Sequence, residues 1–263
     1  MPPAKKKPRT YDSRRIRAAV TGQFGQVADA VRELTPEQLA RPTGLGAWTV
    51  AELAAHIAWV ADSLARGLDR PPGAKAELPP HEWPFATAAL AGRIAEAAGE
   101  TLSGAPLPEL FERAGARLAA ALDAHRDDRV LDLWIGPMTL GDFLVTRTVE
   151  LVVHTDDLNR AAGLSVPLDR QALAACTRLL ADALAHKAPG GAVEVRIPPF
   201  AVVQCIEGPR HTRGTPPNVV ETDPLTWLRL ATGRTTWAEA VDAAAVSAGG
   251  ERADLAGLLP LMS

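Results

Sequence analysis

Apolar residues recur at intervals of three and four near the N-terminus, between about Asp12 and Leu34. This spacing places them on one side of an α-helix, so the stretch is predicted to be a helix with one buried face. The residues of that face are Ile16, Val20, Phe24, Val27 and Val31. Further helical stretches are predicted at about residues 49–68, 85–102, 108–126 and 139–162. The N-terminal region is therefore expected to be a bundle of four or five helices.

Two of these helices begin at recognisable capping signals. Thr49-x-x-Glu52 is a capping box, in which the hydroxyl and the carboxylate bind free backbone N–H groups at the helix start. Thr139-x-x-Asp142 offers a similar hydroxyl at the start of the last helix of the bundle. Both signals predict where the helix begins, and so they fix which later side chains share a face.

The connections between the first helices are rich in proline and glycine. Residues 35–48 contain two prolines and two glycines, and residues 70–84 are rich in proline, so both are predicted to be irregular. A long connection of this kind is often a lid or rim of a site. The second connection contains His81 and Glu82, which are a candidate lid.

The pattern changes after residues 163–167, which interrupt the helical periodicity. One more helix is predicted at about 170–186, and then apolar and polar residues alternate with period two. Candidate strands cover residues 193–197, 200–206, 218–222 and 244–248. Asp223-Pro224 predicts a helix start and Gly233 a helix stop, and a short helix and a final turn complete the region.

The expected fold class is therefore α+β. We divide the chain into a disordered basic tail (1–10), a helical bundle (11–165) and a small α+β domain (166–263). The net charge is −3, and the only concentrated positive charge lies in the tail, at Lys5, Lys6, Lys7 and Arg9. A balanced surface of this kind gives no field for binding nucleic acid, so no nucleic-acid partner is expected.

Composition also bears on where the protein works. No run of about 18 apolar residues occurs, and no apolar segment follows the basic N-terminus, so neither a transmembrane span nor a signal peptide is expected. The two cysteines, Cys176 and Cys205, lack the spacing of a zinc motif or a disulfide framework. A cytoplasmic location is predicted. The excess of arginine over lysine and the abundance of alanine are typical of a high-GC genome such as that of an actinobacterium.

Three residues of the bundle form a candidate metal site. His56 lies on the apolar stripe of its helix, and Glu150 and His154, four residues apart, share one face of the last helix. Two facing helices can bring such side chains together, and two histidines with one carboxylate leave a coordination position open for catalysis. The alternative is a hydrogen-bonded core histidine beside a simple i,i+4 pair.

The remaining histidines are interpreted as surface residues, because they lie in loops or at helix ends beside charged or turn residues. They are His81, His125, His186 and His211.

Two segments carry a resemblance to a known family. Residues 46–58 (GAWTVAELAAHIA) and 150–158 (ELVVHTDDL) resemble the corresponding segments of DinB-like bundles, specifically those of the mycothiol-dependent maleylpyruvate isomerases. The resemblance implies a divalent ion, zinc in that family, held by His56, Glu150 and His154. It also implies mycothiol as a thiol cofactor. Asp157 is a candidate for orienting His154 through its other ring nitrogen.

The C-terminal region resembles the small sterol-carrier-protein-like domain that follows such bundles. Residues 223–234 and 253–261 carry this resemblance. It implies that this domain covers the metal site and contributes a basic residue to substrate or thiol binding. The candidates are Arg196, Arg213 and Arg234, although a surface position is the favoured interpretation of each. The family's substrate is not carried over, because fold-level analogy does not supply a reaction.

Two functions are therefore favoured over a third, a metal-bearing regulatory or interaction protein. The first is a metal-dependent enzyme in which a mycothiol-like thiol attacks a small electrophile for isomerisation, transfer or detoxification. The alternative is a carrier of a sterol, lipid or other small molecule, with the bundle as a scaffold or degenerate metal-binding unit. Its apolar pocket would be lined by Val195, Ile197, Val202 and Ile206, which plain core packing explains equally well. A monomer or homodimer is expected.

Overall fold

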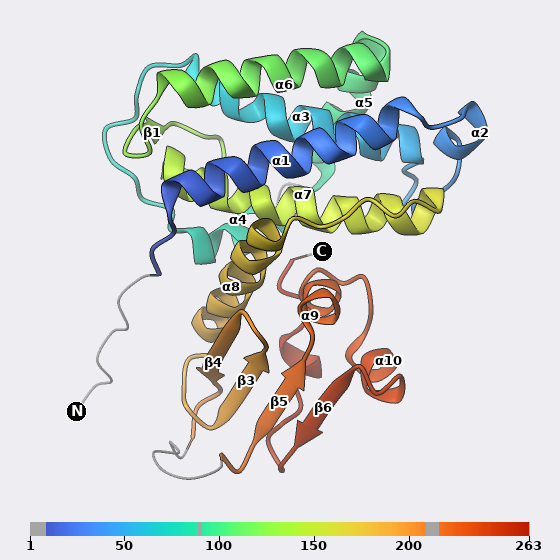
Figure 1. The fold of residues 1–263 in the computed structure, drawn as a ribbon. Coiled ribbons are helices and arrows are strands. Elements are labelled where there is room, and N and C mark those ends of the chain that lie inside the picture. Colours follow the sequence, from blue (N-terminus) through green and yellow to red (C-terminus); the bar gives the residue numbers. More distant parts are fainter. Residues whose placement is uncertain (1–8, 89–90, 209–215, 263) are drawn as a thin grey trace.

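The structure is a computed structural model that describes residues 9–88, 91–208 and 216–262. Figure 1 shows long helices lying side by side above a small sheet, with one helix, α8, running from the bundle down to the sheet. The fold class is α+β, as predicted. The elements of the N-terminal half are α1 (Ser13–Arg32), α2 (Pro36–Leu39), α3 (Val50–Leu68), η1 (Pro80–Glu82), α4 (Trp83–Ala88), α5 (Ala91–Gly104), α6 (Leu107–Ala124), β1 (Val130–Leu131), β2 (Met138–Thr139) and α7 (Leu140–Ala162).

The bundle is built on the predicted apolar faces. Helix α1 packs against α6 and α7, and α3 packs against α5, α6 and α7. All five residues of the predicted α1 face are buried, and burying each such side chain contributes about 1.5–3 kcal/mol. The capping box of Thr49 and Glu52 is present at the start of α3. The hydroxyl of Thr139 accepts the backbone N–H of Asp142 at the start of α7.

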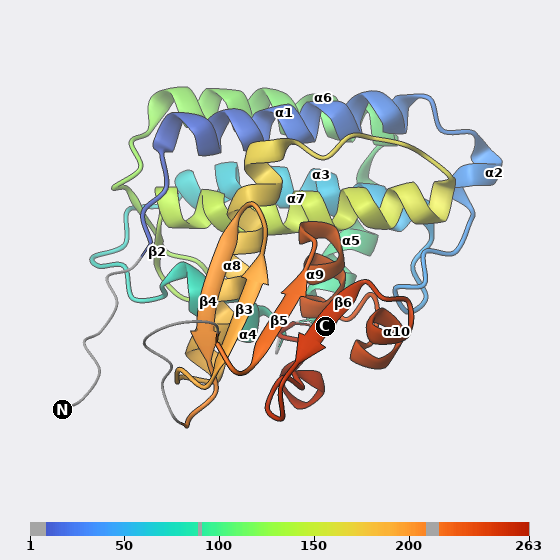
Figure 2. The ribbon, with the colours of Figure 1, turned by 60° about the horizontal axis from the view of Figure 1, so that its bottom comes forward.

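The C-terminal half is a four-stranded sheet covered by helices (Figure 2). The strand order is β4-β3-β5-β6, in which β3 and β5 are parallel and the outer pairs are antiparallel. Helix α8 packs against β4 and α9 below and against α1 and α7 above, so it joins the two halves. The elements are α8 (Arg170–Lys187), β3 (Val193–Ile197), β4 (Ala201–Cys205), β5 (Val219–Thr222), α9 (Pro224–Ala231), α10 (Trp237–Asp242), β6 (Val246–Gly249) and η2 (Ala256–Leu258).

Both predicted connections contain helical turns, so that part of the sequence interpretation was wrong. Helix α2 begins at a capping box of Thr35 and Gln38, with Pro36 at its first position. In the second connection Pro80 opens η1 and Pro84 lies in the first turn of α4. Proline is tolerated at these positions because the N–H it lacks would have no helical partner there. The predicted helix 85–102 corresponds to residues of α4 and α5, and residues 89 and 90 between them lie outside the described residues.

The residues proposed for an apolar pocket do not share one side of the sheet. Val195 and Ile197 are fully buried, whereas Val202 is 57% exposed. Since successive residues of a strand point to opposite faces, Val202 lies on the outer face of β4 while its neighbours Ala201 and Val203 face the core. Val195 and Ile197 are therefore core residues of the domain.

Arg9, in the described part of the predicted tail, contacts helix α8. Arg9 donates two hydrogen bonds, of 2.8 and 2.9 Å, to the carboxylate of Asp182 on α8. Lys5, Lys6 and Lys7 lie outside the described residues. Among the helices that the structure describes, none is both long and apolar enough to cross a membrane.

Candidate metal centre

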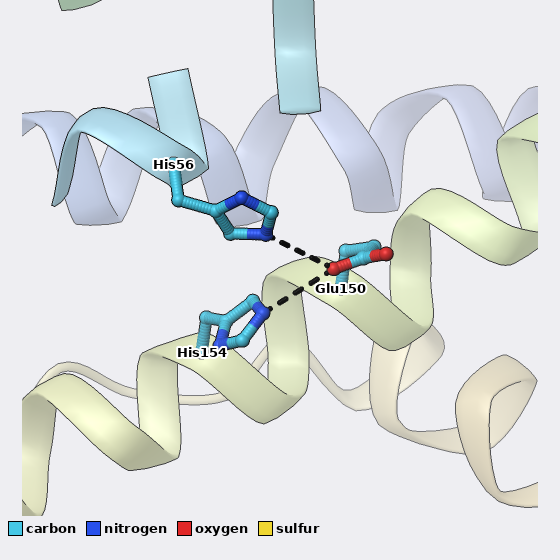
Figure 3. Close-up of side chains that lie close together, drawn as sticks. All are labelled: His56, Glu150 and His154. Atoms are coloured by element: carbon cyan, nitrogen blue, oxygen red, sulfur yellow. Dashed lines mark hydrogen bonds and ion pairs between the residues drawn. The ribbon is translucent and has the colours of Figure 1, made fainter. Parts of the chain in front are cut away.

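The structure brings His56, Glu150 and His154 together in the bundle (Figure 3). Helix α3 supplies His56 and helix α7 supplies the other two, and their ligand atoms lie within 4.8 Å of one another. Both histidines direct Nε2 at the same carboxylate oxygen. Oε2 of Glu150 is 3.4 Å from Nε2 of His56 and 3.3 Å from Nε2 of His154.

These separations suit a divalent ion. Zinc binds nitrogen and oxygen at about 2.0–2.1 Å, so two ligands of a tetrahedral site lie about 3.3 Å apart. The two nitrogen-to-oxygen separations thus already match the spacing that such an ion requires, and the two nitrogens lie within 4.8 Å of each other. His56 is 2% exposed, and Glu150 and His154 are each 11% exposed at the side chain, so solvent competes little for their ligand atoms.

The hydrogen bond of His154 with Asp157 indicates that a cation can bind between His154 and Glu150. His154 Nδ1 lies 3.0 Å from Oδ2 of Asp157, an acceptor, so Nδ1 carries the proton. In the neutral ring Nε2 then has a lone pair, which faces the carboxylate oxygen of Glu150. Two acceptors this close require a proton or a metal ion between them. The donor set therefore fits a divalent metal.

Electrostatics keep the carboxylate of the cluster charged. Burial alone would raise the pKa of Glu150, but hydrogen bonds that His154 and His56 donate when Nε2 carries a proton, together with the charge of Arg147, hold it well below its usual range. Burial lowers the pKa of His56, which favours its neutral, metal-binding form. For His154 burial is outweighed by Asp157 and Glu150, and its pKa is raised.

Asp157 links the cluster to the C-terminal half. It is fully buried, and Arg234 donates a 2.9 Å hydrogen bond to the same oxygen that accepts from His154. The preceding residue, Asp156, accepts two hydrogen bonds from Arg229 of α9, at 2.9 and 2.7 Å. Two consecutive carboxylates of α7 therefore hold two arginines of the C-terminal half, and one of these carboxylates also orients His154.

A cavity of about 410 Å³ opens beside the cluster. Glu150 and Arg147 form part of its wall, together with Trp59, Trp83 and Trp134. Arg147 is 6% exposed at the side chain, and its nearest carboxylate oxygen, on Glu150, is 3.9 Å away. Its guanidinium lies instead over aromatic rings, 4.2 Å from the centre of Phe143 and 5.7 Å from that of Trp83. A cation held this way can still bind an anionic ligand.

Sequence interpretation found the three clustered residues and Asp157 but not the roles of the arginines. Of the three arginines considered, Arg234 reaches Asp157, while Arg196 pairs with Glu194 on the sheet at 2.7 Å. Arg213 and His211 lie outside the described residues. Arg229 was missed. Arg147 was missed as well, because its cavity is completed by α4 and by the loop that carries Trp134.

The fold and the cluster define a class of protein: a helical bundle with a two-histidine, one-carboxylate centre, joined to a small α+β domain. Residues 20–159 match the sequence profile of the mycothiol maleylpyruvate isomerase N-terminal domain, and residues 169–261 match that of the bacterial SCP ortholog. The first match covers more than half of the chain. The chain belongs to the mycothiol maleylpyruvate isomerase N-terminal domain family.

Solved structures show the same overall architecture. A crystal structure of the mycothiol-dependent maleylpyruvate isomerase is 16% identical to this chain, with a TM-score of 0.59, and the match covers 93% of this chain and 95% of that one. A histidine-to-alanine mutant of that enzyme matches over the same shares with 15% identity and a TM-score of 0.59. A search of curated protein sequences gave no significant match. The likeness extends over both halves of the fold.

Proposed function

We propose that this protein is a metal-dependent enzyme that uses a low-molecular-weight thiol of the mycothiol type to act on a small anionic electrophile. The observation that carries the proposal is the convergence of three ligand atoms, within 4.8 Å of one another, beside a cavity that Glu150 shares with the buried Arg147. The family supports it, because the solved relatives are named as mycothiol-dependent isomerases. Isomerisation is therefore the reaction we favour over transfer or detoxification.

His56, Glu150 and His154 would hold the metal, for which we favour zinc. A divalent metal bound there would deprotonate a thiol placed in its open position and so supply the nucleophile. Asp157 keeps the proton of His154 on Nδ1 and thereby leaves Nε2 free as a ligand. Arg234 neutralises Asp157, and Arg229 docks the C-terminal half onto the same helix.

The protein offers no thiolate of its own near the cavity. Burial raises the pKa of both cysteines, that of Cys205 to about 11, and neither residue lines the cavity. A free, protonated thiol in the interior is a poor nucleophile. An external thiol therefore fits the site better. The two free cysteines also suit the cytoplasmic, reducing location that we propose.

Arg147 is proposed to bind a carboxylate of the substrate. It is the buried cation of the cavity, and a guanidinium binds a carboxylate through paired hydrogen bonds. The aromatic side chains around it exclude water, which strengthens that interaction. These features suit a small unsaturated keto acid or diacid better than a neutral lipid.

The decisive experiment is a thiol-dependent activity assay. The metal-loaded protein is incubated with unsaturated keto acids, maleylpyruvate included, with mycothiol, with another small thiol, or with none. We expect turnover only with a thiol, and its loss in Glu150→Gln. Turnover that is independent of thiol, or unchanged in Glu150→Gln, would contradict the proposal.

A further inference from the structure

A second cluster of two histidines and one carboxylate lies away from the first. His81 and Glu82 belong to η1, and His186 lies in the last turn of α8. Their ligand atoms lie within 4.8 Å of one another. As in the bundle, both histidines direct Nε2 at one carboxylate oxygen: Oε1 of Glu82 is 3.8 Å from His81 and 3.9 Å from His186. Both histidines are surface residues, as predicted, but the sequence did not predict that they lie together with Glu82.

The three side chains are accessible and are not engaged elsewhere. Their exposed fractions are 31% for His81, 42% for Glu82 and 46% for His186. Within residues 9–88, 91–208 and 216–262, none of the three side chains makes a hydrogen bond within 3.5 Å, and their own separations are 3.8 and 3.9 Å. Asp182, one turn earlier on α8, is occupied by Arg9. The cluster thus presents three free donors to a cation arriving from solvent.

The donor types and their spacing favour a metal ion over a plain ion pair. A tetrahedral site needs ligand atoms about 3.3 Å apart, so each histidine nitrogen must approach the carboxylate oxygen by about half an ångström. Exposed side chains on a short 3₁₀ turn and at a helix end can make this movement through rotamer changes. Imidazole nitrogen with a carboxylate oxygen is a donor set for Zn²⁺ and similar transition ions, not for Ca²⁺ or Mg²⁺.

We propose that His81, Glu82 and His186 form a second divalent-cation site, which clamps the segment before α4 to α8. The site is independent of the function proposed for the bundle. Its ion would join two segments that are remote in sequence, since η1 belongs to the N-terminal half and α8 leads into the sheet. Lys187, beside His186, donates hydrogen bonds to the carbonyl oxygens of Leu258 and Pro260, so the same end of α8 also holds the C-terminal segment.

The clamp would act on the wall of the cavity. Trp83 directly follows Glu82 in the chain, is fully buried, and places its ring 5.7 Å from Cζ of Arg147. Fixing η1 therefore restrains the residue that packs against the buried arginine. We expect bound Zn²⁺ to slow amide hydrogen exchange in a peptide covering residues 77–88.

The test is a Zn²⁺ titration of the full chain, followed by hydrogen exchange. The variants are His186→Ala, His56→Ala and, as a matched control for a lost histidine, His125→Ala. We expect two equivalents in the parent and in His125→Ala, and one in each of the other two. The protection of residues 77–88 should vanish in His186→Ala and persist in His56→Ala.

Two outcomes would overturn the second site. One is that His186→Ala takes up as much Zn²⁺ as the parent, and the other is that Zn²⁺ leaves the exchange of residues 77–88 unchanged in the parent. Failure of the bundle site gives a different pattern. In that case His56→Ala and the parent would bind equally, while His186→Ala would still lose its equivalent.

Discussion

The described part of the chain contains two clusters with the same donors, one inside the bundle and one at the surface. The inner cluster, His56, Glu150 and His154, has nitrogen-to-oxygen separations of 3.4 and 3.3 Å. The outer cluster, His81, Glu82 and His186, has separations of 3.8 and 3.9 Å, and its side chains are 31–46% exposed. The comparison shows how burial and the carboxylate of Asp157 bring the same set of ligands closer together in the inner cluster.

Preorganisation is the physical difference between the two. In the inner cluster two packed helices fix the side chains, and Asp157 fixes the ring of His154. The outer side chains must give up rotamer freedom when an ion binds, which costs free energy. The inner cluster should therefore bind the same ion more tightly and exchange it more slowly. It is also the one that adjoins a cavity holding a buried cation.

The largest effect is expected from removing the shared carboxylate charge. Glu150→Gln should weaken Zn²⁺ binding at the inner cluster by more than about 100-fold, because it removes the only anionic ligand there. Glu82→Gln is the matched change in the outer cluster and should leave the inner affinity unaltered. Competition with a chelator measures both. Equal losses in the two variants would show that the clusters are not separate sites.

A smaller effect is expected from the residue that orients His154. Asp157→Asn should weaken inner binding by about 10- to 100-fold, the usual cost of losing such a partner, and leave the outer cluster unchanged. Asp156→Asn is the control, since it removes the neighbouring pairing with Arg229 but not the contact to His154. If both variants bound Zn²⁺ equally well, Asp157 would serve only to hold Arg234 of the C-terminal half and not to orient His154.

The cavity arginine should affect substrate binding and not metal content. Arg147→Gln is expected to raise KM for an anionic substrate by about tenfold or more, because a hydrogen bond to a charged group is worth about 1.5–3 kcal/mol. Arg93→Gln removes a charge from the exposed rim of the same cavity and should have little effect. Steady-state kinetics on metal-loaded protein separates the two. A change in kcat alone would contradict an anchoring role.

The smallest effect concerns the cap of the helix that carries His56. Thr49→Ala should lower the free energy of unfolding by about 0.5–2 kcal/mol, because backbone N–H groups at the start of α3 lose their acceptor. Denaturant unfolding measures this loss. Zn²⁺ stoichiometry should stay at the parental value, since core packing and not the cap holds the inner cluster. Loss of metal in this variant would show that the site depends on the end of α3.

Much of the inner cluster was predictable because its geometry is local. Periodicity and capping residues placed His56 on the buried face of α3, and four-residue spacing placed Glu150 and His154 on one face of α7. Helix α2 was missed although Thr35 and Gln38 form a capping box, because the prolines and glycines around them favoured a loop. The outer cluster was not predictable, since it depends on how α8 packs against η1, which no local pattern specifies.

The most direct test of the account is elemental analysis of the tag-free protein beside His56→Ala, after dialysis against a weak chelator that strips loosely held ions. We expect about one equivalent of zinc or another divalent ion in the parent and none in the variant, with both proteins folded. No metal in the parent even after reconstitution, or equal metal in the two proteins, would contradict it and leave the three residues as ordinary packing of the bundle.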